Sequence, residues 1–225
     1  MQYSIEGGNF PVAICQLNQG ESMYCQRGAM AWMTPGVKME TSTGGGLAKG
    51  LARVFSGESI FVNTYTAESA GQSITFASSF AGQILPVDVG KCTIIAQKRA
   101  FLAAEPSVSM NVTFTKRLGA GFFGGEGFIL QKFSGKGTAL LEIDGSIVEK
   151  TLAPGEELLI DNGYLAAMEE TVAFEIRTVA GIKNVVFGGE GLFLGYLRGP
   201  GKVWLQTMPM AVLAHEIASM LPSKG

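Results

Sequence analysis

Three glutamates hold equivalent places in a recurring glycine-rich stretch, and their type and spacing make them the first candidates for chemistry. The three copies are, in chain order, Phe55-Ser56-Gly57-Glu58-Ser59, Phe123-Gly124-Gly125-Glu126-Gly127 and Phe187-Gly188-Gly189-Glu190-Gly191. Carboxylates that converge on one axis repel each other, and a bound cation or proton relieves that repulsion. The alternative is that Glu58, Glu126 and Glu190 each accept backbone N–H bonds in their own loop. We favour this structural role, because the repeat alone explains the three residues.

Basic residues precede each copy, and together with the glycine N–H groups they could hold an anion. They are Lys49, Arg53, Lys116, Arg117 and Lys183. However, Gly44-Gly45-Gly46 lacks the Gly-Lys-Ser/Thr of a phosphate-binding loop, so the nucleotide signal is weak. We therefore favour local ion pairs with the glutamates, or solvated loop charges, over an anion site.

No coherent catalytic set is visible among the remaining polar residues. His215 is the sole histidine, which removes every paired-histidine metal motif, and we expect it on the surface of a terminal helix. Cys15, Cys25 and Cys92 are odd in number and lack C-x-x-C spacing, so we expect buried thiols in a reducing compartment. The sequence thus predicts a protein that is not an enzyme, with no catalytic residue, metal or cofactor.

Composition favours self-association over nucleic acid binding. Charged residues make up only 16% of the 225 residues, which implies more apolar surface than a monomer normally exposes. The net charge of −2 gives no general attraction to nucleic acid, which we regard as disfavoured. The N-terminal residues lack the basic and apolar regions of a signal peptide, and no apolar run of about 18 residues occurs. We expect a soluble, cytoplasmic homo-oligomer.

Local patterns predict β-strands. Ser73–Phe76, Val108–Phe114 and Val172–Ile176 alternate apolar with polar or small residues. Asp144-Gly145 reads as a two-residue hairpin turn between its flanking apolar runs, and Phe133–Glu142 and Leu197–Gln206 read as two versions of a further hairpin. Helical spacing occurs only at Leu47–Phe55 and after Pro209, where a short helix over 209–221 is predicted to pack outside the body or on a neighbour.

The repeat extends along the whole chain. Phe123 and Phe187 are 64 residues apart, and the same offset separates Val108 from Val172. Units of this length are too long for propeller blades or short solenoid repeats. We predict a single all-β domain over 1–225 with three pseudo-repeats, at about 1–77, 78–143 and 144–208, packed around one pseudo-threefold axis.

Apolar residues crowd the glycine-rich loops, where polar residues are the norm. We considered two roles: the loops fold inward and hold the core, or they protrude and contact another subunit, a partner or a membrane surface. Under the second, the interface candidates are Phe122, Phe123, Phe187, Phe193 and Trp204.

At these paired motifs the sequence resembles bacterial members of a mitochondrial-biogenesis family, the altered inheritance of mitochondria protein 24 family. The matching residues extend over nearly the whole chain and include Trp32-Met33, Ser56–Tyr65, Leu118–Gly127, Leu152–Glu156 and Phe187–Gln206. Tyr164 departs from the pattern, where related sequences favour histidine.

The resemblance implies a β-sandwich of the double-stranded β-helix type with internal triplication, related to the fold of the tryptophan RNA-binding attenuation protein. It implies no reaction, cofactor or catalytic residue. Our leading hypothesis is a non-enzymatic homo-oligomeric scaffold or interaction protein. The alternatives are a small-ligand or anion-binding module and a protein that associates peripherally with membranes, and a protein partner is compatible with each.

Overall fold

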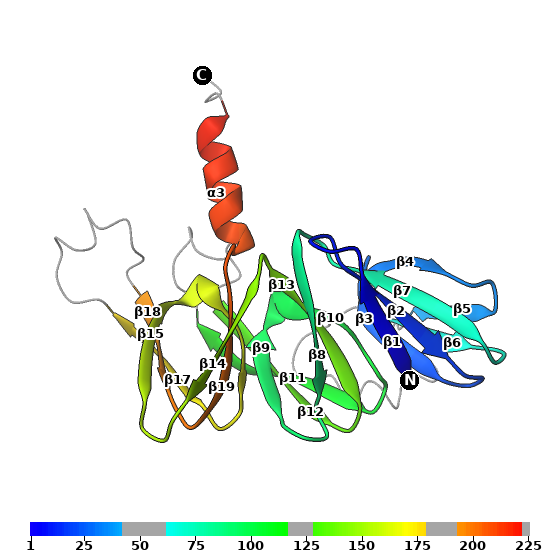
Figure 1. Cartoon of the computed structure of the whole chain (residues 1–225), viewed down its shortest axis with the longest axis horizontal. Helices are drawn as coiled ribbons and strands as arrows, with labels where there is room; N and C mark the ends of the chain where they lie inside the picture. Colours follow the sequence, from blue (N-terminus) through cyan, green and yellow to red (C-terminus); the bar gives the residue numbers. More distant parts are fainter. Residues whose placement is uncertain (42–61, 117–127, 179–192, 222–225) are drawn as a thin grey trace.

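In the part of the chain that the structure describes, a row of antiparallel β-sheets is followed by a C-terminal helix (Figure 1). The computed structural model describes residues 1–41, 62–116, 128–178 and 193–221. The elements of these ranges are β1 (Gln2–Glu6), β2 (Val12–Leu17), β3 (Ser22–Gln26), β4 (Met30–Met33), β5 (Val37–Thr41), β6 (Val62–Ala67), β7 (Gln72–Ala77), β8 (Gly82–Asp88), β9 (Ile94–Gln97), the 3₁₀ turn η1 (Lys98–Ala100), β10 (Phe101–Ala104), β11 (Val108–Lys116), β12 (Phe128–Gly135), β13 (Thr138–Asp144), β14 (Ile147–Leu152), β15 (Glu157–Asp161), the 3₁₀ turn η3 (Asn162–Tyr164), β16 (Leu165–Glu169), β17 (Ala173–Thr178), β18 (Phe193–Arg198), β19 (Gly201–Gln206) and α3 (Met210–Met220). The predicted β-rich fold and short C-terminal helix are confirmed. The helix predicted at Leu47–Phe55 lies outside the described residues.

Four sheets follow one another along the long axis of the molecule (Figure 1). We name them sheet A (β1-β2-β7-β4), sheet B (β5-β6-β3-β10-β13-β8), sheet C (β11-β12-β9-β16-β19-β14) and sheet D (β15-β18-β17). Sheets B and C each have six strands, whereas sheet D has three and sheet A has four. The two inner sheets are therefore the larger ones.

The residue pattern of each strand follows from its place in this row. In β2 of sheet A the buried residues alternate, at Ala13, Cys15 and Leu17, because only one face of the sheet meets a core. In β13 of sheet B the run Ala139–Ile143 is buried at every position. An inner sheet has a core on both faces, so its central strands are almost continuously apolar.

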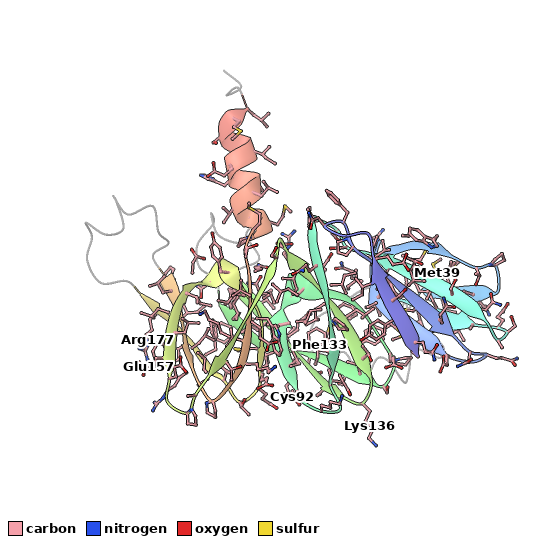
Figure 2. All side chains as sticks on the ribbon, in the orientation of Figure 1. Met39, Cys92, Phe133, Lys136, Glu157 and Arg177 are labelled. Carbon is pink, nitrogen blue, oxygen red and sulfur yellow. The ribbon has the colours of Figure 1, made fainter. Side chains whose placement is uncertain are left out.

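Each neighbouring pair of sheets encloses one hydrophobic core. Leu140 of sheet B packs with Phe76 of sheet A in the first core. On the opposite face of the same strand, Leu141 packs with Phe133 of sheet C in the second core, and Figure 2 shows Phe133 deep in the middle of the row. The third core joins sheets C and D through residues such as Leu130 and Leu197. Sheets B and C thus depend on both neighbours for their burial.

The predicted hairpins are wrong, although the turns themselves are present. Gly145 has a φ of +73°, the left-handed conformation that glycine adopts readily, but β13 pairs with β8 and β10 whereas β14 pairs with β19. Likewise β12 and β13 belong to sheets C and B, and β18 and β19 belong to sheets D and C. The chain crosses a core at these turns, since the flanking strands carry apolar faces that pack against each other instead of pairing edge to edge.

Two strand pairings produce the six-stranded sheets. In sheet B, β10 pairs with β3, so that Ala103 lies opposite Cys25 and Ala104 opposite Tyr24. In sheet C, β16 pairs with β9, so that Ala167 lies opposite Ala96 and Met168 opposite Ile95. Each pairing joins strands that are far apart in the sequence.

Tyr24 links sheets B and C across the second core. Its fully buried hydroxyl donates a hydrogen bond of 3.0 Å to the carbonyl oxygen of Val108. We expect Tyr24→Phe to lower the free energy of unfolding by about 1–2 kcal/mol, because an acceptor in the core loses its donor. Urea unfolding measures the loss, with Tyr3→Phe on the exposed β1 as the control, for which we expect almost none. Equal effects of the two substitutions would contradict the structural role of this hydroxyl.

Candidate functional site

Most of the site residues predicted from the sequence lie outside the described residues. These are Glu58, Glu126 and Glu190, the basic residues Lys49, Arg53, Arg117 and Lys183, and the aromatic residues Phe122, Phe123 and Phe187. Lys116 ends strand β11, and its side chain also falls outside the described part. Whether the three glutamates converge therefore stays a prediction.

The remaining predicted residues occupy different surroundings. Phe193 is partly buried against the third core. Trp204 is only 7% exposed, packs in the second core and donates from Nε1 to Oε2 of Glu149 at 2.9 Å. It is thus placed inside its own chain and not on the surface. His215 is exposed on α3, as expected.

The cysteines are core residues or lie at the edge of a core. Burial raises the pKa of Cys15 and the pKa of Cys25 to about 12, and both thiols are free. Cys92 is partly exposed, and burial again raises its pKa. A thiol with a raised pKa is protonated at neutral pH and is a poor nucleophile. This environment matches the small-hydrophobe role expected from the sequence.

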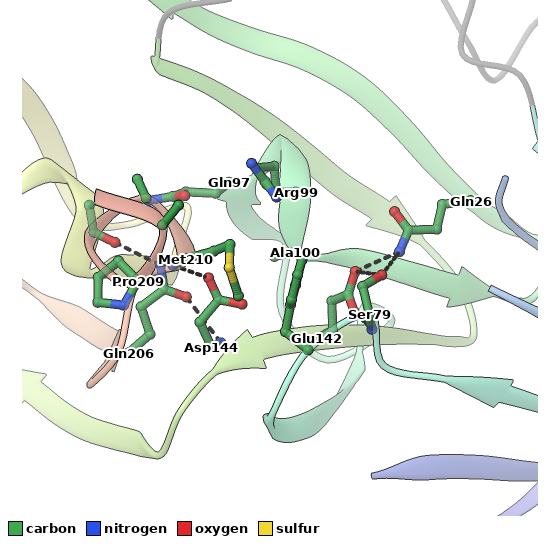
Figure 3. Close-up of a pocket in the computed structure, with 14 residues that line it drawn as sticks. Gln26, Ser79, Gln97, Arg99, Ala100, Glu142, Asp144, Gln206, Pro209 and Met210 are labelled. Atoms are coloured by element: carbon green, nitrogen blue, oxygen red, sulfur yellow. Dashed lines mark hydrogen bonds between the residues drawn. The ribbon is translucent and has the colours of Figure 1, made fainter. Parts of the chain in front are cut away.

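A cavity of about 360 Å³ lies beside the first turn of α3, where strands β3, β9, β13 and β19 end (Figure 3). Polar side chains gather here because the last residue of a strand lies beyond the apolar core. The cavity is lined by Gln26, Ser79, Phe80, Gln97, Arg99, Ala100, Glu142, Asp144, Gly163, Gln206, Pro209, Met210, Ala211 and Ala214.

Glu142 is the buried acid of this cavity. It lies on the same face of β13 as Leu140 and is 8% exposed. Its Oε1 accepts from Gln26 Nε2 at 2.5 Å and Ser79 Oγ at 3.2 Å, and its Oε2 accepts from the Ser79 backbone N–H at 2.6 Å and Ser78 Oγ at 3.1 Å. Burial raises the pKa of Glu142, while these donors pull it back. The carboxylate joins sheet B to the segment after β7.

Asp144 holds the start of α3. The helix begins after Pro209, which offers no side-chain cap, and Asp144 Oδ2 instead accepts from the Met210 backbone N–H at 2.8 Å. A carboxylate here satisfies a helix N–H group that lacks an intrahelical partner and complements the positive end of the helix dipole. Burial raises the pKa of Asp144, whereas that hydrogen bond and the charge of Arg99 lower it.

Amide side chains and one guanidinium complete the lining. Gln97 donates to the Asn162 carbonyl oxygen at 3.0 Å, and Gln206 donates to the Gly163 carbonyl oxygen at 2.6 Å. Arg99 is exposed, and its guanidinium carbon lies 5.9 Å from the centre of the Phe80 ring. Arg99 is the one cation among the residues that line the cavity, and its charge acts on the carboxylate of Asp144 beside it.

The cavity was missed by sequence reasoning, although one signal for it was present. The alignment of Phe133–Glu142 with Leu197–Gln206 places Glu142 opposite Gln206, so both copies end on a long polar residue after an apolar run. Both of these residues line the cavity. Asp144 was interpreted only as a turn residue, because its contact with α3 joins positions 66 residues apart.

The four sheets of the described residues define a mostly-β protein. The chain matches the family model described as mitochondrial biogenesis AIM24 over residues 3–208, and it therefore belongs to that family. It is 28% identical to an uncharacterised protein of Streptococcus pyogenes serotype M6, over 100% of this chain and 93% of that protein. It also resembles the crystal structure of a Streptococcus pyogenes protein, with a TM-score of 0.78, 27% identity and coverage of 98% of this chain and 99% of the other. The family resemblance expected from the sequence is confirmed.

Within the described residues, no helix has the length and apolar character needed to cross a membrane. The same ranges hold no group of three or more histidine, cysteine, aspartate or glutamate side chains arranged to bind a metal ion.

Glu142 supports the fold more than an exposed acid does. We expect Glu142→Ala to lower the free energy of unfolding by about 2 kcal/mol, because it removes the charged acceptor of several part-buried donors, such as the Ser79 N–H. The matched control is Glu40→Ala on β5, where the carboxylate is 48% exposed and forms an ion pair with Lys38, and a change within about 0.5 kcal/mol is expected. Urea unfolding measures the free energy of unfolding of both variants. A loss in Glu142→Ala as small as that in Glu40→Ala would contradict the structural role of Glu142.

Proposed function

We propose that this protein is a non-enzymatic, homo-oligomeric scaffold whose assembly covers surfaces that a single chain leaves exposed. The observation that carries the proposal is helix α3, which projects from the row of sheets (Figure 1) and has no buried residue. Three of its apolar side chains, Val212, Ile217 and Met220, are 39%, 52% and 78% exposed.

A helix of this kind needs a partner for thermodynamic reasons. α3 has 11 residues, and isolated helices shorter than about 12 to 15 residues are marginal in water. Among the described residues, the contacts that tie α3 to the sheets lie at its N-terminal end, where the Met210 N–H donates to Asp144 and Met210, Ala211 and Ala214 line the cavity. The outer turns gain stability only if their apolar side chains pack against something else.

A second copy of this chain is the partner that we favour. α3 carries one acidic residue, Glu216, and neither lysine nor arginine, so charge does not select a strongly charged partner. The rest of the chain is also poor in charge, and Trp32 and Leu159, on the terminal sheets A and D, are 54% and 58% exposed. Identical helices can pack about a two-fold axis, which buries the same surface on both copies.

The proposal includes the finer architecture expected from the sequence, namely three pseudo-repeats of a double-stranded β-helix type. It is supported by a register shift that recurs in three pairings, between Met30 and Trp32, between Phe101 and Ala103, and between Leu165 and Ala167. A relation to the fold of the tryptophan RNA-binding attenuation protein and a cytoplasmic location stay predictions.

The use of the acidic groups supports a non-enzymatic role. Both oxygens of Glu142 accept internal hydrogen bonds, and Asp144 holds the start of α3. Groups that are held in this way contribute to the structure of the chain.

The cavity favours a second candidate function, the binding of a small anion or polar ligand. Its volume of about 360 Å³ falls within the usual range for ligand sites, and Arg99 supplies a cation at its mouth. This function is compatible with assembly, because the cavity lies beside the base of α3 and leaves the outer turns accessible.

The scaffold proposal is tested by removing the apolar face of α3 while its helix propensity is kept. Ile217 and Met220 lie three residues apart on one face, and we expect Ile217→Gln combined with Met220→Gln to weaken self-association at least tenfold. Ala218→Gln, on the opposite face, is the control with unchanged association. Sedimentation equilibrium measures the dissociation constant. Unchanged association of the double variant would overturn the role of α3. If the wild-type chain floats with lipid vesicles and the double variant does not, a membrane surface is favoured as the partner of α3 instead.

The ligand-binding candidate is tested with inorganic phosphate as the probe anion. We expect phosphate to raise the melting temperature of the wild-type chain by a few degrees, because a ligand that binds the folded state stabilises it. The melting temperature of Arg99→Met should not change when phosphate is added. Arg27→Met removes an arginine that follows the cavity residue Gln26 and serves as the control that keeps the response. An equal response in both variants would count against an anion site at Arg99.

A further inference from the structure

Sheets A and D have the strand orders of the two halves of a six-stranded sheet. Each inner sheet consists of two three-stranded halves: β5-β6-β3 joins β10-β13-β8 in sheet B, and β11-β12-β9 joins β16-β19-β14 in sheet C. Sheet D, β17-β18-β15, has the order of the first kind of half. The β4-β7-β2 part of sheet A has the order of the second kind, with β1 added outside.

Registers confirm that the strands correspond. β4 pairs with β7 through the same register shift that β10 makes with β13 and β16 makes with β19. On the other half, Gln26, Gln97 and Asp161 end β3, β9 and β15, and they lie opposite Val62, Leu130 and Leu194. The free side of β4 therefore corresponds to the side of β10 that meets β3, and the free side of β15 to the side of β9 that meets β16.

The side chains at these two edges, which pair with no described strand, are more exposed than their counterparts in the inner sheets. Leu159 is 58% exposed, whereas Tyr24, its counterpart in the sheet B pairing, is fully buried. Trp32 is 54% exposed, whereas its counterparts Ala103 and Ala167 are fully buried. On the neighbouring strand, the large Trp32 has the small Thr75 as its partner, whereas the small Ala103 and Ala167 have the larger Leu140 and Trp204. Each of these cross-strand pairs therefore contains one large side chain.

The other edge strands carry the residues that normally block strand addition, which are charges and proline. These are Glu6 on β1, Lys38 on β5, Pro86 on β8, Lys116 on β11, Lys150 on β14 and Arg177 on β17. By contrast, β4 reads Met30-Ala31-Trp32-Met33, with neither charge nor proline. β15 carries charges only at its two ends, Glu157 and Asp161, and its centre, Leu158-Leu159-Ile160, is apolar.

We propose that β4 of one chain pairs antiparallel with β15 of a second copy, so that sheets A and D merge into one continuous sheet. By correspondence with the inner pairings, Trp32 lies opposite Ile160 and Met33 opposite Leu159. The partner is a second copy because the two edges lie at opposite ends of the row within one chain, separated by three cores (Figure 1).

This inference rests on the proposal that the chain self-assembles, and it specifies a surface other than α3. The contact is head to tail, because a β4 edge always receives a β15 edge. Such a heterologous contact produces a closed ring if the rotation between copies closes, and a filament if it does not.

Disulfide trapping between separate chains tests the pairing. Met33→Cys and Leu159→Cys are made as two proteins, each with Cys92→Ser, since Cys15 and Cys25 are fully buried. Residues directly opposite in an antiparallel pair have Cα atoms about 4.5–5.5 Å apart, within the reach of a disulfide. Mild oxidation of the mixture should give a cross-linked pair of chains on a non-reducing gel, at a yield at least tenfold above that of either protein alone. Glu157→Cys replaces Leu159→Cys as the control, because it lies two residues along the same strand and out of register.

A second variant checks the pairing without cysteine chemistry. Leu159→Lys should weaken self-association at least tenfold, whereas Val148→Lys, at a similarly exposed apolar position on the edge strand β14, should not. A wild-type oligomer that forms no cross-link and survives Leu159→Lys would overturn this pairing and leave the scaffold proposal intact. A wild-type chain that stays monomeric would overturn both. A variant with both Met33→Cys and Leu159→Cys that forms its cross-link only within one chain would overturn the choice of a second copy.

Discussion

The pairing of β3 with β10 and of β9 with β16 is the interaction on which the rest of the structure depends. Each pairing merges two three-stranded halves into a six-stranded sheet with a hydrophobic core on both faces. Without it, the backbone groups of Cys25 and Ala103 would be buried without partners, at a cost of several kcal/mol per strand. The row of sheets and cores is therefore held by hydrogen-bonded ladders and apolar packing together, and neither is sufficient alone.

The same arrangement explains where polar groups and exposed apolar groups occur. Strands that leave the core end on long polar residues, and four such ends surround the cavity beside α3. Glu142 and Asp144 are held there by internal donors, so they fix the segment after β7 and the first turn of the helix. At the two ends of the row and along α3, apolar side chains stay uncovered in the single chain. Assembly provides the missing cover in our account.

The sequence predicted the strands and turns more reliably than it predicted which strands pair with each other. The alternation in Val108–Phe114 correctly predicts a strand, and Gly145 correctly marks a turn, because both signals are local. The hairpin at Asp144-Gly145 was wrong, since a turn residue fixes a reversal of the chain and not the sheet that the next strand joins. The cavity could not be predicted for a related reason. Its residues come from six separate segments, and the repeat relates Glu142 to Gln206 and Gln26 to Gln97 without showing that these positions meet.

Native mass spectrometry of the unmodified protein tests the central claim, self-assembly, most directly. The chain has a mass of 23.7 kDa, and our account predicts ions at a defined multiple of this mass that persist under gentle conditions. The spectrum also reports the mass of any bound small molecule. Such a molecule would support the ligand-binding candidate and leave the claim of self-assembly unchanged. A spectrum that contains only the single 23.7 kDa chain, at every protein concentration, would contradict the account.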